Sequence, residues 1–285
     1  MSEFPLLPWL ALREPLDAAS RSTALTRAVV DALPRDRPLR IVDLGCGTGS
    51  NVRYLQRFLP GAHEWLLVDK DPTVLAVARV SLEAVLYDDG RHAAAVGNGL
   101  QTVPHETRQL DLGARDAPEI FAGRDLVTAS ALLDLVSAEF LTWLAGRCRE
   151  NGGVAFFTLT YTGRSISTPA EPEDDEMCVL LNRHQQQSDK GFGPMAGPDA
   201  VACAERVFAA AGYRVRREPS DWHIAPEARE LQRLLIEGWA DAAREMAPRD
   251  SARIDDWLAR RLAHVDAGRS RIVVSHEDLL AVPLG

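Results

Sequence analysis

The sequence predicts a doubly wound α/β fold, in which helices cover both faces of a mainly parallel sheet. Short apolar runs alternate with amphipathic helical patterns over the first 161 residues. A glycine-rich turn joins the first apolar run to the next helix, and a hydrophobic content of 46% in 285 residues is enough to fill a core. Because each parallel connection needs a crossover, strands that alternate with helices imply a parallel sheet wrapped on both faces.

The first half of the chain supplies the elements of that sheet. A helical pattern covers 16–33, and Ser50 is placed to cap the helix that follows the glycine-rich turn. Asp71 and Pro72 open another helix, which continues to Val85. A Gly- and Asn-rich passage separates this helix from the third strand. The expected strands are 39–44, 64–69, 106–112, 125–130 and 154–161, with the Gly- and Asn-rich passage at 90–99 and a helix at 139–150.

The regular alternation stops after Tyr161. Residues 162–197 predict a loop-rich insertion, and its acidic run "EPEDDE" at 171–176 indicates a solvated surface loop. The remaining expected elements are a helix at 198–212, a strand at 213–219, two amphipathic helices and a last strand at 271–276.

Composition limits the classes of function. The formal net charge of −9 disfavours a broad phosphate-binding face, because non-specific nucleic-acid affinity comes from Lys and Arg that displace counterions. The 4 cysteines form no C-x-x-C pair, so neither a zinc site nor a disulfide framework is expected. No apolar run reaches the length of a membrane span. We therefore expect a cytoplasmic protein with reduced thiols, no metal and a small-molecule partner.

The glycine-rich turn carries the most specific motif. A dinucleotide-binding turn has the pattern G-x-G-x-x-G, but here the sixth position is Ser50 and the third glycine, Gly49, comes one residue early. The sequence instead reads acid-x-Gly-x-Gly-x-Gly from Asp43. This segment, "DLGCGTG", resembles motif I of the class I S-adenosylmethionine-dependent methyltransferases.

The resemblance implies roles for three acids. Asp43 would face the ammonium of S-adenosylmethionine, Asp69 would accept the ribose hydroxyls, and Asp111 would lie near the adenine amine. A carboxylate beside the turn attracts this cationic ligand and would repel a pyrophosphate. The alternative is that the acids only cap turns, and Asp69 would also suit the ribose of NAD. The predicted cofactor residues are Asp43, Gly45, Cys46, Gly47, Gly49, Asp69, Lys70, Asp111, Leu112, Ser130 and Arg21.

The resemblance also implies a seven-stranded Rossmann-like methyltransferase sheet with an antiparallel last strand. Ligands of open α/β sheets bind at the carboxyl ends of the strands, and the insertions after strands five and six start from that edge. They would form a mainly helical cap over the methyl group. We expect a single domain over 1–285, with its core at 16–161, 198–219 and 269–285 and its cap at 162–197 and 220–268.

Three residues are candidates for a general base, which is needed only if the acceptor's nucleophile carries a proton. Asp134 follows the fourth strand and could instead stabilise the start of a helix. His184 lies in the polar segment "NRHQQQSDKGFG", which could also be an ordinary exposed loop. His223 follows strand six and could be a surface histidine.

Other residues are candidates for binding the acceptor or the cofactor's carboxylate. Arg183 and Lys190 would pair with an acid group of the acceptor. Tyr161 ends the fifth strand, and Trp222 follows the sixth, where it could equally be packed in the cap. Arg21 would meet the methionine carboxylate, unless it is a solvated helix arginine.

These observations predict a class I methyltransferase that moves the methyl of S-adenosylmethionine to an O, N or C nucleophile of a small molecule. S-adenosylhomocysteine would be the product. Two alternatives stay open, because fold does not determine function. One is an enzyme of the same fold that uses S-adenosylmethionine without methylation, and the other is a non-catalytic binding or scaffold protein. An apolar face of the cap could serve a homodimer.

Overall fold

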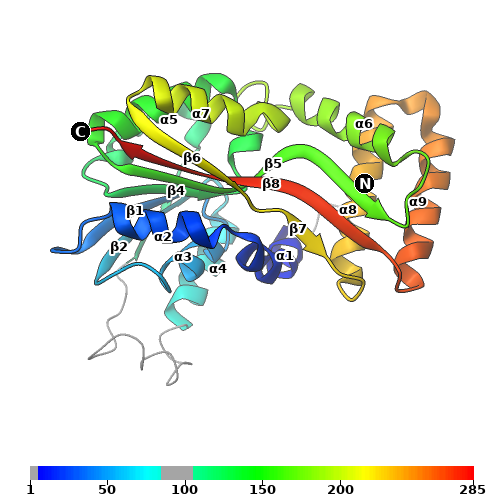
Figure 1. The fold of residues 1–285 in the computed structure, drawn as a ribbon, viewed down its shortest axis with the longest axis horizontal. Coiled ribbons are helices and arrows are strands. Elements are labelled where there is room, and N and C mark those ends of the chain that lie inside the picture. The colour runs from blue at the N-terminus through cyan, green and yellow to red at the C-terminus, as the bar shows by residue number, and fades with distance from the viewer. Residues whose placement is uncertain (1–5, 85–104) are drawn as a thin grey trace.

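The computed structural model describes residues 6–84 and 105–285. Within them an eight-stranded sheet has the order β3-β2-β1-β4-β5-β8-β6, and β7 pairs with β8 (Figure 1). Strands β1 to β5 are parallel, whereas β8 is antiparallel to β5 and β6. The predicted fold class is therefore confirmed. The strands are β1 Leu39–Leu44, β2 His63–Asp69, β3 His105–Gln109, β4 Leu126–Ser130, β5 Val154–Thr168, β6 Tyr213–Pro219, β7 Trp222–Ile224 and β8 Arg271–Pro283.

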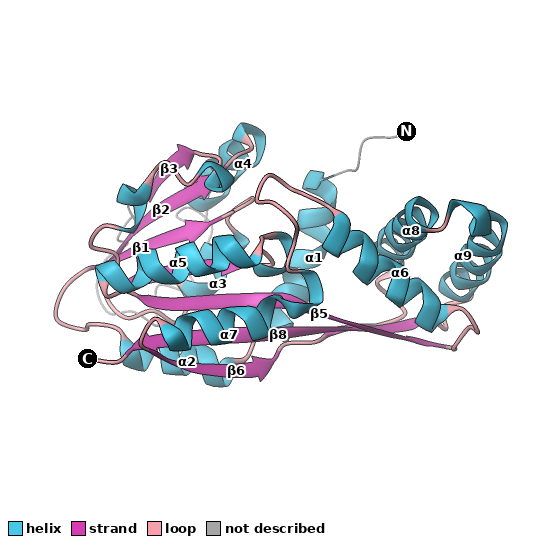
Figure 2. Cartoon of the chain, turned by 90° about the horizontal axis from the view of Figure 1, so that it is seen from above, coloured by secondary structure: helices cyan, strands magenta, loops and turns pink. Residues whose placement is uncertain are grey.

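Helices cover both faces of the sheet, and Figure 2 shows α5 and α7 over one of them. The apolar sides of α5 and α7 pack on one face, and those of α2, α3 and α4 pack on the other. The central strands are nearly continuous apolar runs because both of their faces are buried. The helices are α1 Leu6–Ser20, α2 Thr23–Ala32, α3 Ser50–Leu55, α4 Pro72–Ala84, α5 Ala138–Asn151, α6 Asp174–Gln187, α7 Ala200–Ala210, α8 Arg229–Met246 and α9 Ser251–Asp266.

The N-terminal helical region differs from the prediction. The chain forms two helices instead of one over 16–33, because Ser22 accepts a hydrogen bond from the Leu25 amide and caps α2. The first helix, α1, begins already at Leu6 and contains Pro15. The predicted end of the third helix at Val85 and the passage at 90–99 lie outside the described residues.

Strands β5 and β8 are longer than predicted and leave the sheet together as a two-stranded ribbon. They stay paired as far as Thr168 and Arg271, with register shifts between Phe157 and Thr160 and between Tyr161 and Ser165. Polar residues interrupt the β5 part of this ribbon, which has no continuous apolar run to reveal it in the sequence. Helices α6, α8 and α9 surround the end of the ribbon and form the cap (Figure 1).

The prediction of a loop-rich insertion with a solvated acidic run is wrong. Residues 174–187 form α6, so Arg183 and His184 lie on a helix. The acids lie at its N-terminus, where the helix dipole stabilises negative charge. They also pair with α9: Glu171 and Glu173 bind Arg260, and Asp174 binds the fully buried Arg261 at 3.0 Å.

No helix of the described chain is long and apolar enough to cross a membrane.

Candidate functional site

The turn after β1 is shaped by its three glycines. Gly45, Gly47 and Gly49 have φ values of 62°, 53° and 83°, a region that residues with a Cβ rarely adopt. The Gly47 amide donates to Oδ2 of Asp69 at 2.9 Å, so the turn is tied to the end of β2. A Cβ on Gly47 would lie 3.6 Å from Leu10 of α1. Because these glycines lack side chains, α1 packs close to the backbone of the turn.

A cavity of about 470 Å³ lies between this turn and α1. Its walls come from α1, the glycine-rich turn, the ends of β2 and β4, and Lys190. Its polar wall holds three acids, Asp17, Asp69 and Asp71, and three bases, Arg13, Lys70 and Lys190. The lining residues are Leu6, Trp9, Leu10, Arg13, Asp17, Gly45, Cys46, Gly47, Thr48, Ser50, Asn51, Asp69, Lys70, Asp71, Val74, Ser130, Ala131, Leu135 and Lys190.

Asp43 lies behind the cavity wall, not on it. Its side chain is fully buried, and its Oδ1 accepts a hydrogen bond from Nδ2 of Asn51 at 2.6 Å. Burial raises the pKa of Asp43 to about 7, although the Asn51 hydrogen bond and the Arg21 charge act in the opposite direction. Within 6–84 and 105–285, its Oδ2 has no hydrogen-bond partner. Asp43 therefore does not line the cavity but holds the side chain of Asn51, which does.

Arg21 is buried, so it is not a solvated arginine. Its Nη1 donates to Oδ1 of Asn51 at 2.6 Å, and its Nη2 donates to Oγ of Ser130 at 3.1 Å. Its guanidinium also lies 4.4 Å from the ring centre of Tyr54. Arg21 holds two residues of the cavity wall but does not line the cavity itself.

The end of β2 offers its acid to the cavity. Asp69 accepts hydrogen bonds from the amides of Gly47 and Asp71 and keeps further lone pairs on both oxygens. Lys70 also lines the cavity and donates its Nζ to the Lys190 carbonyl at 3.3 Å. These contacts place the predicted ribose acid on the cavity.

The predicted adenine residues lie apart from the cavity. Asp111 accepts a hydrogen bond from the Gly113 amide at 2.9 Å, and Leu112 is buried in the core next to it. The carbonyl of Gly191 lies so close to Gly113 that a Cβ there would collide with it. The segment at 188–194 therefore lies between Asp111 and the cavity wall that Lys190 forms.

Three acceptor candidates lie together near the end of β4, although none of them is among the residues that line the cavity. Asp134 is buried directly after β4, and burial raises its pKa to about 6. It receives a backbone hydrogen bond from Tyr161, whose hydroxyl donates to Asn182 at 3.0 Å. Trp222 is buried beside them in the same apolar cluster as Tyr161. One oxygen of Asp134 has no partner among the described residues.

Among the acceptor candidates, Lys190 is the one that lines this cavity in the described part of the chain. His184 on α6 is hydrogen-bonded to Glu245 of α8 at 2.9 Å, and Arg183 beside it is exposed. His223 is exposed and lines a separate cavity of about 480 Å³ between α1, β7 and the start of α8. The structure thus separates His184 and His223 from Asp134.

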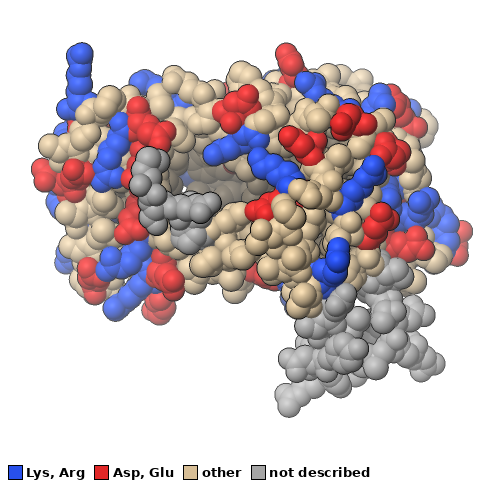
Figure 3. All heavy atoms as spheres, turned by 180° about the vertical axis from the view of Figure 1, so that it is seen from behind, with Lys and Arg blue, Asp and Glu red and all other residues tan. Residues whose placement is uncertain are grey.

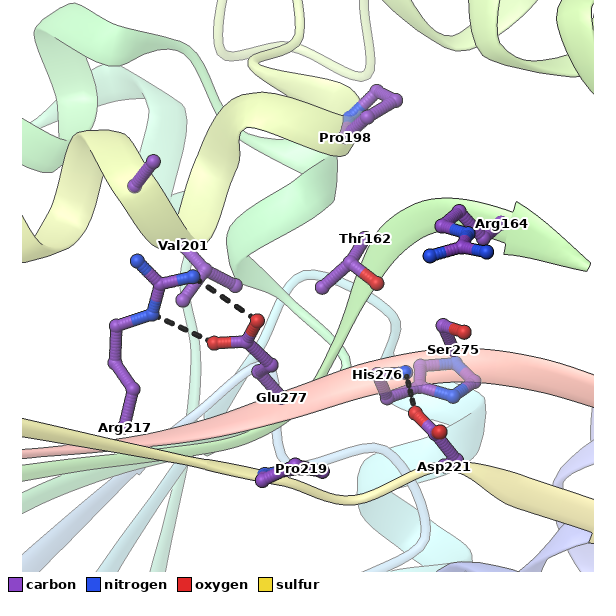
Figure 4. A pocket seen from close by; sticks show the side chains of 11 residues that line it. Thr162, Arg164, Pro198, Val201, Arg217, Pro219, Asp221, Ser275, His276 and Glu277 are labelled. Carbon is purple, nitrogen blue, oxygen red and sulfur yellow. Dashed lines mark hydrogen bonds and ion pairs between the residues drawn. The ribbon is translucent and has the colours of Figure 1, made fainter.

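A third cavity, of about 390 Å³, lies where β5, β6, β8 and α7 meet (Figure 4). Arg217 and Glu277 form a bidentate ion pair at 2.6 and 3.0 Å on its wall, and Asp221 accepts the His276 amide at 2.9 Å. Thr162 and Arg164 face it from the irregular stretch of β5.

Sequence reasoning missed the residues that α1 and β8 contribute. Arg13 and Asp17 line the cavity, and His276 of β8 stacks 4.9 Å from Trp222. The signal for α1 was present in the spacing of Trp9, Leu12 and Leu16, which pack on the cap. Prolines in the same stretch obscured it. In the described part of the chain, no group of three or more His, Cys, Asp or Glu residues could hold a metal ion.

Comparison with known proteins gives only distant structural likenesses. No family model and no curated protein matches the sequence. The cyclopropane synthase MmaA2 from Mycobacterium tuberculosis is 13% identical, with a TM-score of 0.47, over 90% of this chain and 83% of that one. The YcgJ protein from Bacillus subtilis is 14% identical, with a TM-score of 0.49, over 93% of this chain and 100% of that one.

A third likeness is to a phosphoethanolamine N-methyltransferase from Haemonchus contortus, at 15% identity and a TM-score of 0.44. It covers 97% of this chain and 57% of that one. At this distance, the assignment of the fold depends on the strand order and the turn of this chain itself. With β8 antiparallel between β5 and β6 and a glycine-rich turn after β1, the chain has the Rossmann-like fold of class I S-adenosylmethionine-dependent methyltransferases.

Proposed function

We propose that this chain is an S-adenosylmethionine-dependent methyltransferase with a small-molecule acceptor. One observation carries the proposal: the glycine-rich turn and Asp69 meet on the wall of one cavity of about 470 Å³, which α1 covers. A volume of that size is typical of small-molecule and cofactor sites.

The charges of the cavity wall fit this cofactor. Asp17, Asp69 and Asp71 line the cavity together with Arg13, Lys70 and Lys190, and Asp43 lies directly behind Asn51. Carboxylates attract the sulfonium and the ammonium of S-adenosylmethionine, and basic side chains suit its carboxylate. Asp69 would accept the ribose hydroxyls, and the methionine part would lie toward Asn51 and Ser130.

The bound cofactor would supply an activated methyl group on its sulfonium. The protein's task is then to hold the acceptor in line with that methyl, and such alignment contributes up to roughly 7–11 kcal/mol to lowering a barrier. Asp134 would be the base, because it follows β4 beside the lining residue Leu135 and its pKa of about 6 is close to the pH of the cell. His184 and His223 do not line this cavity, so neither could accept a proton from an acceptor bound there without a rearrangement of the cap.

The acceptor would bind beside Tyr161 and Trp222, with Lys190 at the edge of the cavity. A small molecule is favoured by the net charge of −9. On the face shown in Figure 3, Lys and Arg alternate with Asp and Glu, and some of the basic side chains stand on the rim of a hollow near the middle.

Calorimetric titration with S-adenosylmethionine and with NAD tests the cofactor. We expect saturable heat with S-adenosylmethionine alone, and saturation by NAD alone would refute the proposal. Incubation with pools of small acceptors then tests the reaction. S-adenosylhomocysteine together with a methylated product supports methyl transfer, whereas a product changed without loss of the methyl donor supports the non-methylating alternative. Tight binding without turnover of any pool favours the scaffold alternative.

A further inference from the structure

Arg13 presents an unused pair of hydrogen-bond donors to the cavity. Its Nε donates to Oδ2 of Asp17 at 2.9 Å, and only 14% of its side chain is exposed. Neither of its two Nη nitrogens has a hydrogen-bond partner in the part of the chain that the structure describes. Arg13 nevertheless lines the cavity wall. The Nε edge of this mostly buried guanidinium is therefore bound to Asp17, whereas the edge with the two Nη groups is available to a ligand.

The surroundings of Arg13 hold its guanidinium at the β4 end of the cavity. It lies 5.1 Å from the ring centre of Trp222, and its charge lowers the pKa values of Asp134 and His276. The i,i+4 pair with Asp17 fixes the side chain along α1. The position of the open edge is thus set before any ligand arrives.

Arg21 and Lys70, two other basic residues near this cavity, already use donors in contacts within the protein. Arg21 donates both Nη groups to Asn51 and Ser130, and the Lys70 ammonium reaches the Lys190 carbonyl. Arg21, which the sequence suggested for the methionine carboxylate, would have to give up the side chains that shape the wall. Arg13 could bind a carboxylate through its Nη groups and still keep its hydrogen bond to Asp17.

A planar guanidinium edge matches a carboxylate, because its two N–H groups meet the two oxygens in parallel. Such a pair is stronger in a site that excludes water than on a surface. S-adenosylmethionine brings one carboxylate, at the end of the molecule opposite to its adenine. With its ribose on Asp69 at the β2 side, as proposed above, the cofactor would extend its methionine end across the β1 turn toward Ser130 and Arg13.

We propose that the open edge of Arg13 binds the carboxylate of the cofactor's methionine part. This inference rests on the proposed function. It assigns to α1 a direct contact with the cofactor. Because Asp17 also accepts the indole N–H of Trp222 at 3.0 Å, the same contact joins the bound cofactor to the wall of the acceptor site.

The test compares two ligands that differ at this carboxylate. S-adenosylhomocysteine carries the amino-acid part, whereas 5′-methylthioadenosine lacks it. Both are titrated calorimetrically into the full-length wild type, Arg13→Gln, Arg13→Lys and Asp69→Ala. Arg35→Gln serves as a matched control, because Arg35 pairs with Asp31 on the exposed surface of α2 and the turn after it.

We expect Arg13→Gln to raise the Kd of S-adenosylhomocysteine by about 10- to 100-fold and to leave that of 5′-methylthioadenosine unchanged. Unchanged binding of the shorter ligand also shows that the variant is folded. Arg13→Lys keeps the charge but not the planar edge, so its effect should be smaller. Asp69→Ala should raise the Kd of both ligands, and Arg35→Gln should change neither Kd.

Two results overturn the inference. An equal effect of Arg13→Gln on both ligands, or none on S-adenosylhomocysteine, removes Arg13 from the carboxylate while leaving the cofactor assignment intact. Failure of the wild type to bind either ligand overturns the proposed function itself, and the role of Arg13 with it.

Discussion

The indole N–H of Trp222 donates to Oδ1 of Asp17 at 3.0 Å, although 205 positions separate the two residues. Asp17 belongs to α1, which covers the cavity, and Trp222 belongs to β7 on the cap side. Both side chains are at least 95% buried, at exposures of 4% and 3%. This hydrogen bond therefore joins the helix that covers the cavity to β7.

Replacing Trp222 with Phe should lower the free energy of unfolding, because it removes this hydrogen bond. The change removes the indole donor and leaves a buried carboxylate oxygen of Asp17 without its partner, at a cost of about 1–3 kcal/mol in the free energy of unfolding. Urea titration measures this loss. Trp143→Phe is the control, because Trp143 packs on Phe121 and Phe140 by its ring. An equal loss in the two variants would contradict the role of the hydrogen bond.

Replacing Asp69 with Ala should weaken the binding of S-adenosylmethionine. The variant loses a charged acceptor for the ribose hydroxyls and the bond that ties Gly47 to β2, so the Kd should rise by at least about 10-fold. Calorimetric titration provides the Kd. Asp31→Ala, on the exposed side of α2, should bind like the wild type. An unchanged Kd for Asp69→Ala would refute the ribose role.

Replacing Asp174 with Ala should destabilise the cap strongly. Asp174 pairs with Arg261, which is fully buried, and also accepts the indole N–H of Trp257 at 2.8 Å. Loss of one partner leaves a buried charge unpaired, which typically costs about 3–5 kcal/mol. The unfolding free energy from urea titration tests this. Asp175→Ala removes a neighbouring, exposed acid from the same helix turn and should change little.

The pKa of Asp134 makes stability depend on pH. Burial raises this pKa from 3.8 to about 6, so the folded state holds the proton more tightly than the unfolded state does. The stabilisation is fully present below about pH 4 and is lost as pH rises to about 6. Asp134→Asn removes this dependence. Its stability relative to the wild type should therefore rise by about 3 kcal/mol between pH 4 and pH 7.

The comparison with Asp134→Asn is needed because Asp43, with a pKa of about 7, titrates in an overlapping range. Thermal or urea unfolding of both proteins across that range supplies the difference. A difference that stays constant with pH would show that the pKa of Asp134 is close to that of an exposed aspartate.

The core strands could be predicted because each is a local apolar run. Ile41 and Val42 are buried on opposite faces of β1, which gives the continuous pattern that the sequence shows. The glycine-rich turn was equally readable, because its motif and its positive φ angles are both local. Asp69 could be placed on the cavity for the same reason, as it ends a strand next to that turn.

The cap and the surroundings of Trp222 could not be predicted because they depend on contacts between distant segments. Nothing in the sequence around Asp17 indicates that it will contact Trp222. Likewise, nothing around Arg260 indicates its acidic partners, which lie directly before α6. The outer part of β5 lacks an apolar run because it is only partly buried. The helical position of His184 was missed for a similar reason, since its partner Glu245 lies on the distant α8.

The path of the chain through the cap determines how the protein should unfold. Strand β5 takes the chain out of the sheet, α6 returns it to α7, β6 and β7 lead it out again, and β8 brings it back. Separate domains usually meet where few connections cross. With backbone crossings in both directions along one ribbon, we expect core and cap to melt as one cooperative unit. Coincident unfolding midpoints from tryptophan fluorescence and far-ultraviolet circular dichroism would confirm this, and two separated transitions would contradict it.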